Sequence, residues 1–128
     1  MAAPMIPALN DHEMEKILET AREAGAKSAG YVLLRLPLEI KDLFREWLIA
    51  REPGRASHVM SLIRSMRGGR DYDAEWGKRM KGAGPYAQMM AKRFAVACER
   101  LELNKETIEL RTDLFKPPPQ SGDQLKLL

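Results

Sequence analysis

Residues 64–86 combine the side chains best suited to bind an anionic partner. The segment holds five glycines, six lysines and arginines, two tyrosines and one tryptophan. Glycine lets the backbone approach a ligand closely, arginine and lysine pair with phosphate, and aromatic rings stack on bases. We therefore predict a contact with DNA or RNA, made by Arg67, Arg70, Tyr72, Trp76, Lys78, Arg79, Lys81 and Tyr86.

The positive charge of the chain is concentrated around this segment. The net charge is +3, and residues 64–93 carry eight Lys and Arg against three Asp and Glu. A local excess of cations indicates an anionic partner more strongly than a global excess does. The alternative interpretation is a solvated surface loop rich in arginine, and the aromatic residues bring the two interpretations into balance.

Other residues that could carry chemistry are few and scattered. Cys98 is the one cysteine, which excludes an internal disulfide and a metal site built from cysteines; we expect a buried thiol. His12 and His58 lie far apart in the sequence and are expected at the surface. Three carboxylates suit the positive end of a helix dipole better than a catalytic role: Asp11, Glu13 and Glu15.

The elements that must position these residues begin with a strand at residues 2–7. Asn10 is expected to cap the helix that follows, with Glu13 as its capping-box partner, and Gly25 to end that helix. The apolar run 29–36 is typical of a buried parallel strand. Residues 1–37 therefore predict one βαβ unit.

A mainly helical extension is expected over residues 38–115, and it includes the basic glycine-rich segment. Its helices are predicted at 38–48, 56–66 and 86–103, and residues 107–110 suggest a short extended piece. Residues 116–128 contain three consecutive prolines and are expected to form a flexible tail. The apolar face of the first helix is expected to hold Ile40, Leu43, Phe44, Trp47 and Leu48.

Several motifs along the chain carry a family resemblance. They are Ala3-Pro4-Met5-Ile6-Pro7-Ala8-Leu9-Asn10-Asp11, Ala29-Gly30-Tyr31-Val32-Leu33-Leu34-Arg35-Leu36-Pro37, Met66-Arg67-Gly68-Gly69, Trp76-Gly77-Lys78-Arg79-Met80-Lys81-Gly82, Gly84-Pro85-Tyr86-Ala87 and Leu110-Arg111-Thr112-Asp113-Leu114-Phe115. With them the chain resembles the C-terminal part of radical SAM proteins related to spore photoproduct lyase, described as DNA-repair-photolyase-like. The glycine-rich motifs are the most specific to this subfamily, and the resemblance covers essentially all residues.

The resemblance implies an α/β fold, the C-terminal portion of a partial TIM-like barrel followed by the helical extension. It implies a lyase-like DNA repair enzyme that uses S-adenosylmethionine and a [4Fe–4S] cluster. It also implies that the turn after the first strand lies against the adenine of S-adenosylmethionine, which falls on Met5, Ile6, Pro7 and Asn10.

The chain departs from this family at the cluster. Radical SAM chemistry needs three closely spaced cysteines, and Cys98 stands alone. We therefore expect no cofactor in this chain by itself, and a truncated or split enzyme whose N-terminal half is a partner. No apolar run has the length of a membrane span and no signal peptide is recognisable, so we expect a cytoplasmic protein without a membrane partner.

The C-terminal pentapeptide suggests one further partner. Gln124, Leu125, Leu127 and Leu128 resemble the short peptides by which bacterial repair and replication proteins bind the sliding clamp. The alternative is a tail that packs on the domain through its leucines. For the chain as a whole, the alternatives to an enzyme segment are a stand-alone nucleic-acid-binding module and a purely structural extension of the barrel.

Overall fold

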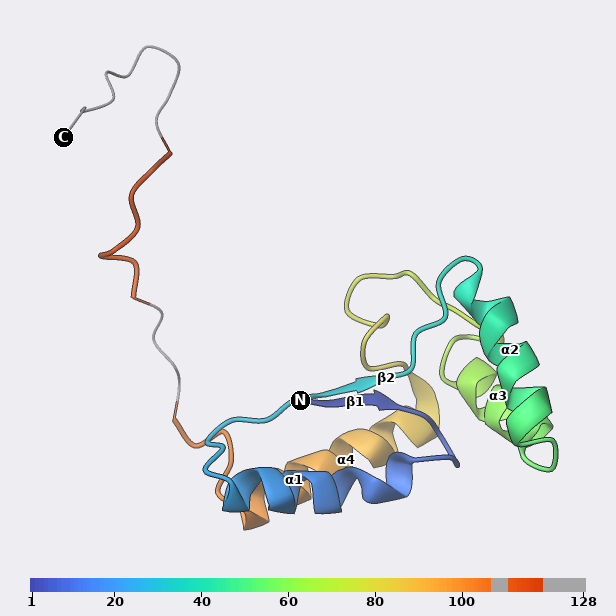
Figure 1. Ribbon diagram of the computed structural model, residues 1–128, viewed down its shortest axis with the longest axis horizontal. Helices are drawn as coiled ribbons and strands as arrows, with labels where there is room; N and C mark the ends of the chain where they lie inside the picture. Colours follow the sequence, from blue (N-terminus) through green and yellow to red (C-terminus); the bar gives the residue numbers. More distant parts are fainter. Residues whose placement is uncertain (107–110, 119–128) are drawn as a thin grey trace.

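A computed structural model describes residues 1–106 and 111–118 (Figure 1). It combines a small sheet with four helices and one 3₁₀ turn. In chain order these are β1 (Ala2–Met5), η1 (Asp11–Glu13), α1 (Met14–Glu23), β2 (Tyr31–Leu33), α2 (Ile40–Arg51), α3 (Ala56–Ser65) and α4 (Gly84–Arg100). The expected extended piece at 107–110 and tail residues 119–128 lie outside the described residues.

The strand–helix–strand unit expected at the N-terminus is present. β1 and β2 pair in parallel, with Ala2 opposite Tyr31 and Met5 opposite Leu33, and the register shifts between these pairs. Gly25 follows α1 with a φ of 94°, a conformation that glycine adopts without steric cost. A mixed α/β chain is therefore shown, whereas its place in a larger barrel stays a prediction.

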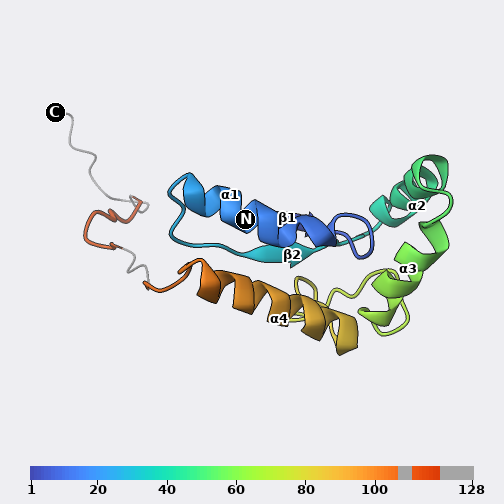
Figure 2. The ribbon, with the colours of Figure 1, turned by 90° about the horizontal axis from the view of Figure 1, so that it is seen from below.

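One face of the sheet is covered by α1 and α4, which lie side by side beneath the strands (Figures 1 and 2). The main core lies between the sheet and these two helices. It combines residues from the βαβ unit, 1–37, with residues from the helical extension that follows it. The Tyr31 and Phe94 rings meet within this core at 4.8 Å between centroids. Its buried members are Ala2, Met5, Met14, Leu18, Leu33, Met66, Ala87, Met90, Ala97, Cys98 and Leu103.

A second core joins α2 and α3 to the end of β2. It contains Leu36, Leu48, Val59, Met60 and Ile63. The predicted apolar face of α2 is wrong in part. Leu48 is buried and Phe44 half-buried because α3 packs on that side of the helix, while three other apolar residues are exposed: Ile40, Leu43 and Trp47.

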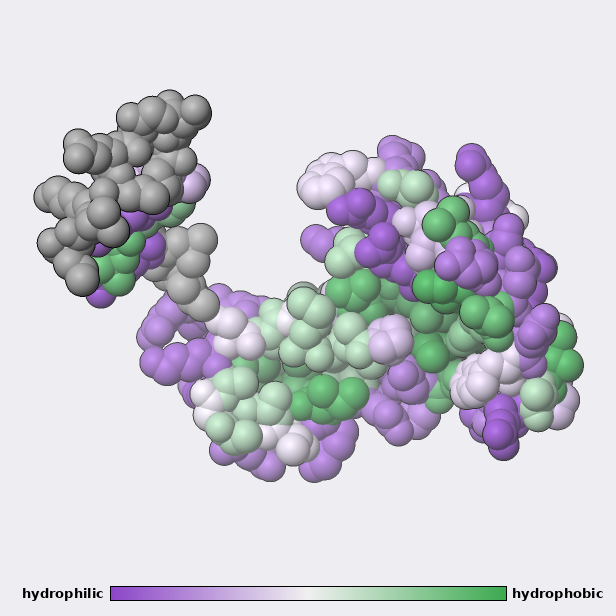
Figure 3. Space-filling model, turned by 45° about the horizontal axis from the view of Figure 1, so that its top comes forward, coloured by the Kyte–Doolittle hydropathy of each residue, from purple (hydrophilic) through white to green (hydrophobic). Residues whose placement is uncertain are grey.

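The second face of the sheet lies open. Ala3 and Pro4 of β1 are exposed and Val32 of β2 is half-buried. With this face turned forward, apolar side chains gather across the middle of the molecule, where the strands run (Figure 3). Since most parallel sheets are covered on both faces, a sheet covered on one face is unusual.

No helix among the described residues has both the length and the apolar character that a membrane crossing requires.

Candidate functional site

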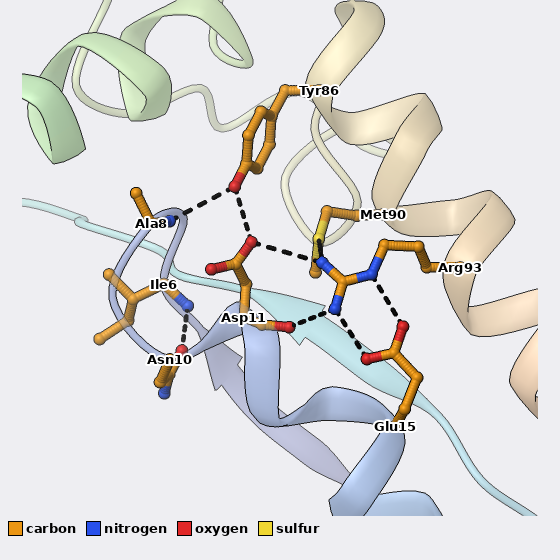
Figure 4. Close-up of polar contacts among 8 residues, drawn as sticks. All are labelled: Ile6, Ala8, Asn10, Asp11, Glu15, Tyr86, Met90 and Arg93. Atoms are coloured by element: carbon orange, nitrogen blue, oxygen red, sulfur yellow. Dashed lines mark hydrogen bonds and ion pairs between the residues drawn. The ribbon is translucent and has the colours of Figure 1, made fainter.

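The turn after β1 is closed by the side chain of Asn10. Its Oδ1 accepts the Ile6 N–H at 2.7 Å (Figure 4). Its Nδ2 donates to the Pro4 carbonyl at 3.0 Å. Asn10 occupies the predicted N-cap position of η1, but its side chain makes no cap bond there, so the predicted capping by this side chain is wrong. The amide instead satisfies the backbone of the turn that precedes it.

The residues expected to contact adenine are largely buried or already hydrogen-bonded in this arrangement. The side chains of Met5 and Pro7 are buried, and the Ile6 N–H is already bonded to Asn10. The other two residues expected to contact adenine, Ile6 and Asn10, are half-buried. A role of this turn in binding S-adenosylmethionine stays a prediction, and it would depend on the partly exposed side chains of these two residues.

A network of charged groups ties α4 to the same turn (Figure 4). Asp11 is 6% exposed; its carboxylate accepts the Tyr86 hydroxyl at 2.6 Å, and Arg93 Nη1 lies 3.6 Å away. Arg93 also donates two bonds to Glu15, at 2.8 and 2.7 Å, and one to the Asp11 carbonyl at 2.9 Å. The Ala8 N–H donates to the Tyr86 hydroxyl oxygen at 3.3 Å.

The electrostatics of this network favour a fixed set of protonation states. Burial first and the Asp11 carboxylate second raise the pKa of Tyr86 to about 12. The hydrogen bond from Arg93 lowers the pKa of Glu15, and the bond to Glu15 raises the pKa of Arg93. These shifts favour a protonated Tyr86 hydroxyl, an ionised Glu15 and a charged Arg93, which are the forms that make the hydrogen bonds of this structural clamp.

Sequence reasoning missed this clamp. Tyr86 was expected to contact nucleic acid, but its hydroxyl is committed to Asp11. Asp11 and Glu15 were assigned to the helix dipole, and Arg93 was not singled out. The partners lie 75 to 82 residues apart, so no local pattern in the sequence relates them.

Arg67 holds the glycine-rich segment in place from inside. It is 2% exposed, and its guanidinium donates to the carbonyls of Lys78 at 2.8 Å and Leu34 at 3.0 Å. Burial lowers the pKa of this guanidinium. The prediction that Arg67 meets phosphate does not fit this position, because the side chain is buried and bridges two stretches of backbone.

Most of the carboxylates of the segment are already paired. Asp71 pairs with Arg45 of α2 and, at 2.7 Å, with Arg64 of α3. Glu75 pairs with Lys78 at 2.8 Å, so this lysine of the predicted interface is partly neutralised. One cation in these pairs, Arg45, comes from outside the segment, and other cations of the segment have no acidic partner among the described residues.

The remaining cations form the candidate interface. Within residues 1–106 and 111–118, no ion pair involves Arg35, Arg70, Arg79 or Lys81. Arg79 lies over the Trp76 ring, 4.3 Å from its centroid, and Trp76 is 81% exposed. Arg35, two residues after β2, donates to the Tyr72 hydroxyl at 3.2 Å, and Tyr72 is half-buried. Sequence reasoning did not single out Arg35.

A metal centre does not fit the described residues. They contain no group of three or more His, Cys, Asp or Glu side chains able to hold a metal ion. Cys98 is buried on α4, and burial raises the pKa of its thiol, as expected for an inert cysteine. Since an iron–sulfur cluster is held by several cysteine thiolates, the chain by itself does not provide a cluster site.

Comparisons with models of protein families, with curated proteins and with solved structures gave no match to this chain.

Proposed function

We propose that the chain is the C-terminal segment of a radical SAM enzyme of the spore photoproduct lyase-like family, acting on nucleic acid. The observation that carries this proposal is the sheet, which among the described residues is parallel, has two strands and is covered by helices on one face alone (Figure 1). Such a sheet has neighbours in the folds that contain it. In a radical SAM barrel the neighbours are the preceding strands and helices.

The two edges of the sheet differ in a way that supports this placement. The outer edge of β2 is occupied, because the Leu33 N–H donates to the Met80 carbonyl of the glycine-rich segment at 3.0 Å. At the other strand, the Ala2 N–H donates to the Gly30 carbonyl, so the backbone groups of Ala3 face away from β2. No strand among the described residues pairs with that edge. It is the edge that a preceding strand would use.

The surface of α1 offers matching support. A groove on its side opposite α4 is lined by Ile17, Thr20, Ala21 and Ala24, and Ile17 is 38% exposed. In a repeated βα fold, the helix that precedes a strand packs beside the helix that follows it. A partner supplying one more strand and helix would therefore cover both the free edge of β1 and this groove.

The chemistry of such an enzyme would reside in a cysteine-bearing half. That half would supply the cluster ligands, because Cys98 is alone and buried. The residues of this chain would complete the barrel wall, bring the turn around Ile6 to its active end, and present the basic segment to the substrate. Active sites of TIM-like barrels lie at the carboxyl ends of the strands, where Ile6 and Arg35 are located.

The test is co-expression with the reading frame encoded directly upstream, each as a separate polypeptide. We expect a polypeptide with a Cys-x-x-x-Cys-x-x-Cys loop to co-purify with this chain and the complex to contain iron and sulfide. Ile17→Glu places a charge in the α1 groove and should abolish co-purification. The matched control is Ile49→Glu on α2, since Ile49 is 63% exposed and lies outside the groove. Equal recovery of both variants would contradict the placement.

The second candidate is a stand-alone nucleic-acid-binding module without catalysis. The observation that favours it is the exposed Trp76–Arg79 stack beside Arg70 and Lys81, which have no ion pair among the described residues. This candidate predicts oligonucleotide binding by the chain alone, weakened steeply by salt, without any cysteine-bearing partner. Co-purification with such a partner decides between the two candidates.

A further inference from the structure

We infer that Trp76 and Arg79 form a platform for one unpaired nucleotide of a single-stranded nucleic acid. The open face of the Trp76 ring would stack on the base, and the edge of the Arg79 guanidinium would pair with a phosphate. This deepens the proposed function and rests on it for the class of substrate.

The geometry of the pair leaves both binding functions available. Arg79 covers one face of the indole, with its guanidinium carbon 4.3 Å from the ring centroid. Trp76 is nevertheless 81% exposed, so its second face is open to solvent. Among the described residues, the Arg79 guanidinium appears in no hydrogen bond or ion pair, and its donors remain available to a phosphate.

The backbone around the pair is held in one conformation. The N–H groups of Lys78 and Arg79 both donate to the Glu75 carbonyl, and the Gly82 N–H donates to the Lys78 carbonyl at 2.7 Å. The buried Arg67 donates to the same Lys78 carbonyl at 2.8 Å. A platform fixed in this way loses little conformational entropy when a ligand binds.

The charges around the platform suit a polyanion. Asp71 and Glu75 are engaged in ion pairs, and Asp73 accepts the Glu75 N–H at 2.9 Å. Arg70 and Lys81 of the segment have no ion pair among the described residues. The bond from Leu33 to Met80 fixes the segment along the edge of β2, next to the equally unpaired Arg35. Cations interleaved with an aromatic platform are typical of single-strand binding.

The single exposed tryptophan ring of the segment favours a single-stranded nucleic acid over a duplex or an anionic membrane as the ligand. A base inside a duplex is stacked on both faces and is accessible to a side chain only after it leaves the stack. An anionic membrane binds amphipathic helices with several apolar side chains. Trp76 instead stands on a turn, where Met80, 38% exposed, is the other large exposed apolar residue of the segment.

The experiment measures binding of the full chain to labelled oligonucleotides by fluorescence anisotropy. Single-stranded DNA, single-stranded RNA, the matching duplex and vesicles containing phosphatidylserine are compared at several salt concentrations. The second tryptophan, Trp47, lies on α2 and is replaced by phenylalanine, so that quenching of the remaining emission reports on Trp76 alone. Stacking is expected to quench this emission in step with the anisotropy change.

We expect Trp76→Ala to weaken single-strand binding about tenfold, and Trp76→Phe to retain most of it, because stacking contributes about 1–3 kcal/mol per base. Arg79→Ala should weaken binding and reduce the salt dependence by about one phosphate contact. Lys41→Ala, an exposed cation on α2, is the matched control and should bind as wild type does.

Three results would overturn the inference: equal affinity of the wild-type and Trp76→Ala chains, preference for the duplex, or binding to vesicles in place of oligonucleotides. Ile17→Glu separates this inference from the proposed function, because it should abolish binding of the cysteine-bearing half and leave single-strand binding unchanged. Retained complex formation without oligonucleotide binding would therefore refute the platform alone.

Discussion

The Tyr86 hydroxyl donates a 2.6 Å hydrogen bond to the buried carboxylate of Asp11, and this bond joins the first turn of α4 to the start of η1. Arg93, two turns further along α4, completes the connection through Asp11 and Glu15. The loop after β1 is thus held by a helix that begins more than seventy residues later in the chain. The turn at the carboxyl end of β1 is thereby connected to α4.

Replacing Tyr86 by phenylalanine should destabilise the fold. The buried Asp11 carboxylate would lose a charge-assisted bond, and such bonds contribute about 1.5–3 kcal/mol. The free energy of unfolding, measured by urea denaturation, is expected to fall by about 2 kcal/mol. Tyr31→Phe is the matched control, because the Tyr31 hydroxyl is buried without a hydrogen-bond partner among the described residues. A loss from Tyr31→Phe as large as that from Tyr86→Phe would contradict this explanation.

The same tyrosine should make stability depend on alkaline pH. Its pKa is raised in the folded protein from 10.0 to about 12, so folding favours the protonated phenol. The resulting contribution is fully present below pH 10.0 and is lost as the pH rises toward about 12. Denaturation midpoints across this interval should fall less steeply for Tyr86→Phe than for the wild type. Parallel curves would show that Tyr86 does not titrate as described.

Truncation of Arg67 should unfold the glycine-rich segment from the sheet. Arg67→Ala leaves the carbonyls of Lys78 and Leu34 without their donor and opens a cavity where the side chain was buried. We expect a loss of about 3 kcal/mol in the free energy of unfolding. Arg70→Ala, at an exposed position of the same segment, should change it by less than about 0.5 kcal/mol. Similar losses for both variants would argue against the bridging role.

A methyl group at Gly82 should cost more than one at Gly77. Both glycines have positive φ, 69° and 87°, so alanine strains the backbone by about 1 kcal/mol at either position. At Gly82 the added Cβ would also lie 3.2 Å from Met66 Cβ and 3.3 Å from a methyl of Leu33, whereas nothing lies within 4 Å at Gly77. Thermal denaturation of the two alanine variants should show the larger decrease in Tm for Gly82→Ala. Equal decreases would show that the contact with β2 is looser than described.

The clamp-binding hypothesis for the C-terminus is tested by deletion. Residues 124–128 lie outside the described part of the chain, so the hypothesis stands on the sequence resemblance alone. Removing them should abolish binding to a bacterial sliding clamp in surface plasmon resonance, while Lys126→Ala should retain it. Unchanged binding after the deletion would exclude the pentapeptide as the contact.

The local pattern of the sequence was sufficient to predict most of the helices and strands. Apolar spacing and glycine positions predicted the parallel strand–helix–strand unit, the helix at Ala56–Ser65 and the helix at Gly84–Arg100 to within a few residues. The prediction that Cys98 is a buried thiol is confirmed. These features depend on the conformational preferences of neighbouring residues, which are read directly from a sequence.

The roles of the polar residues were decided by tertiary contacts. Asn10 is bonded to the turn before it, Arg67 is buried between two carbonyls, and Tyr86 is bonded to Asp11. Each assignment depends on which backbone or side-chain group lies opposite, and the long-range partners are separated by tens of residues. Composition placed a basic, aromatic segment at 64–86, but the fold decided that Arg67 supports it from inside while Trp76 and Arg79 remain at its surface. The physical reason is that burial and pairing are properties of the folded surroundings of a side chain and not of its type.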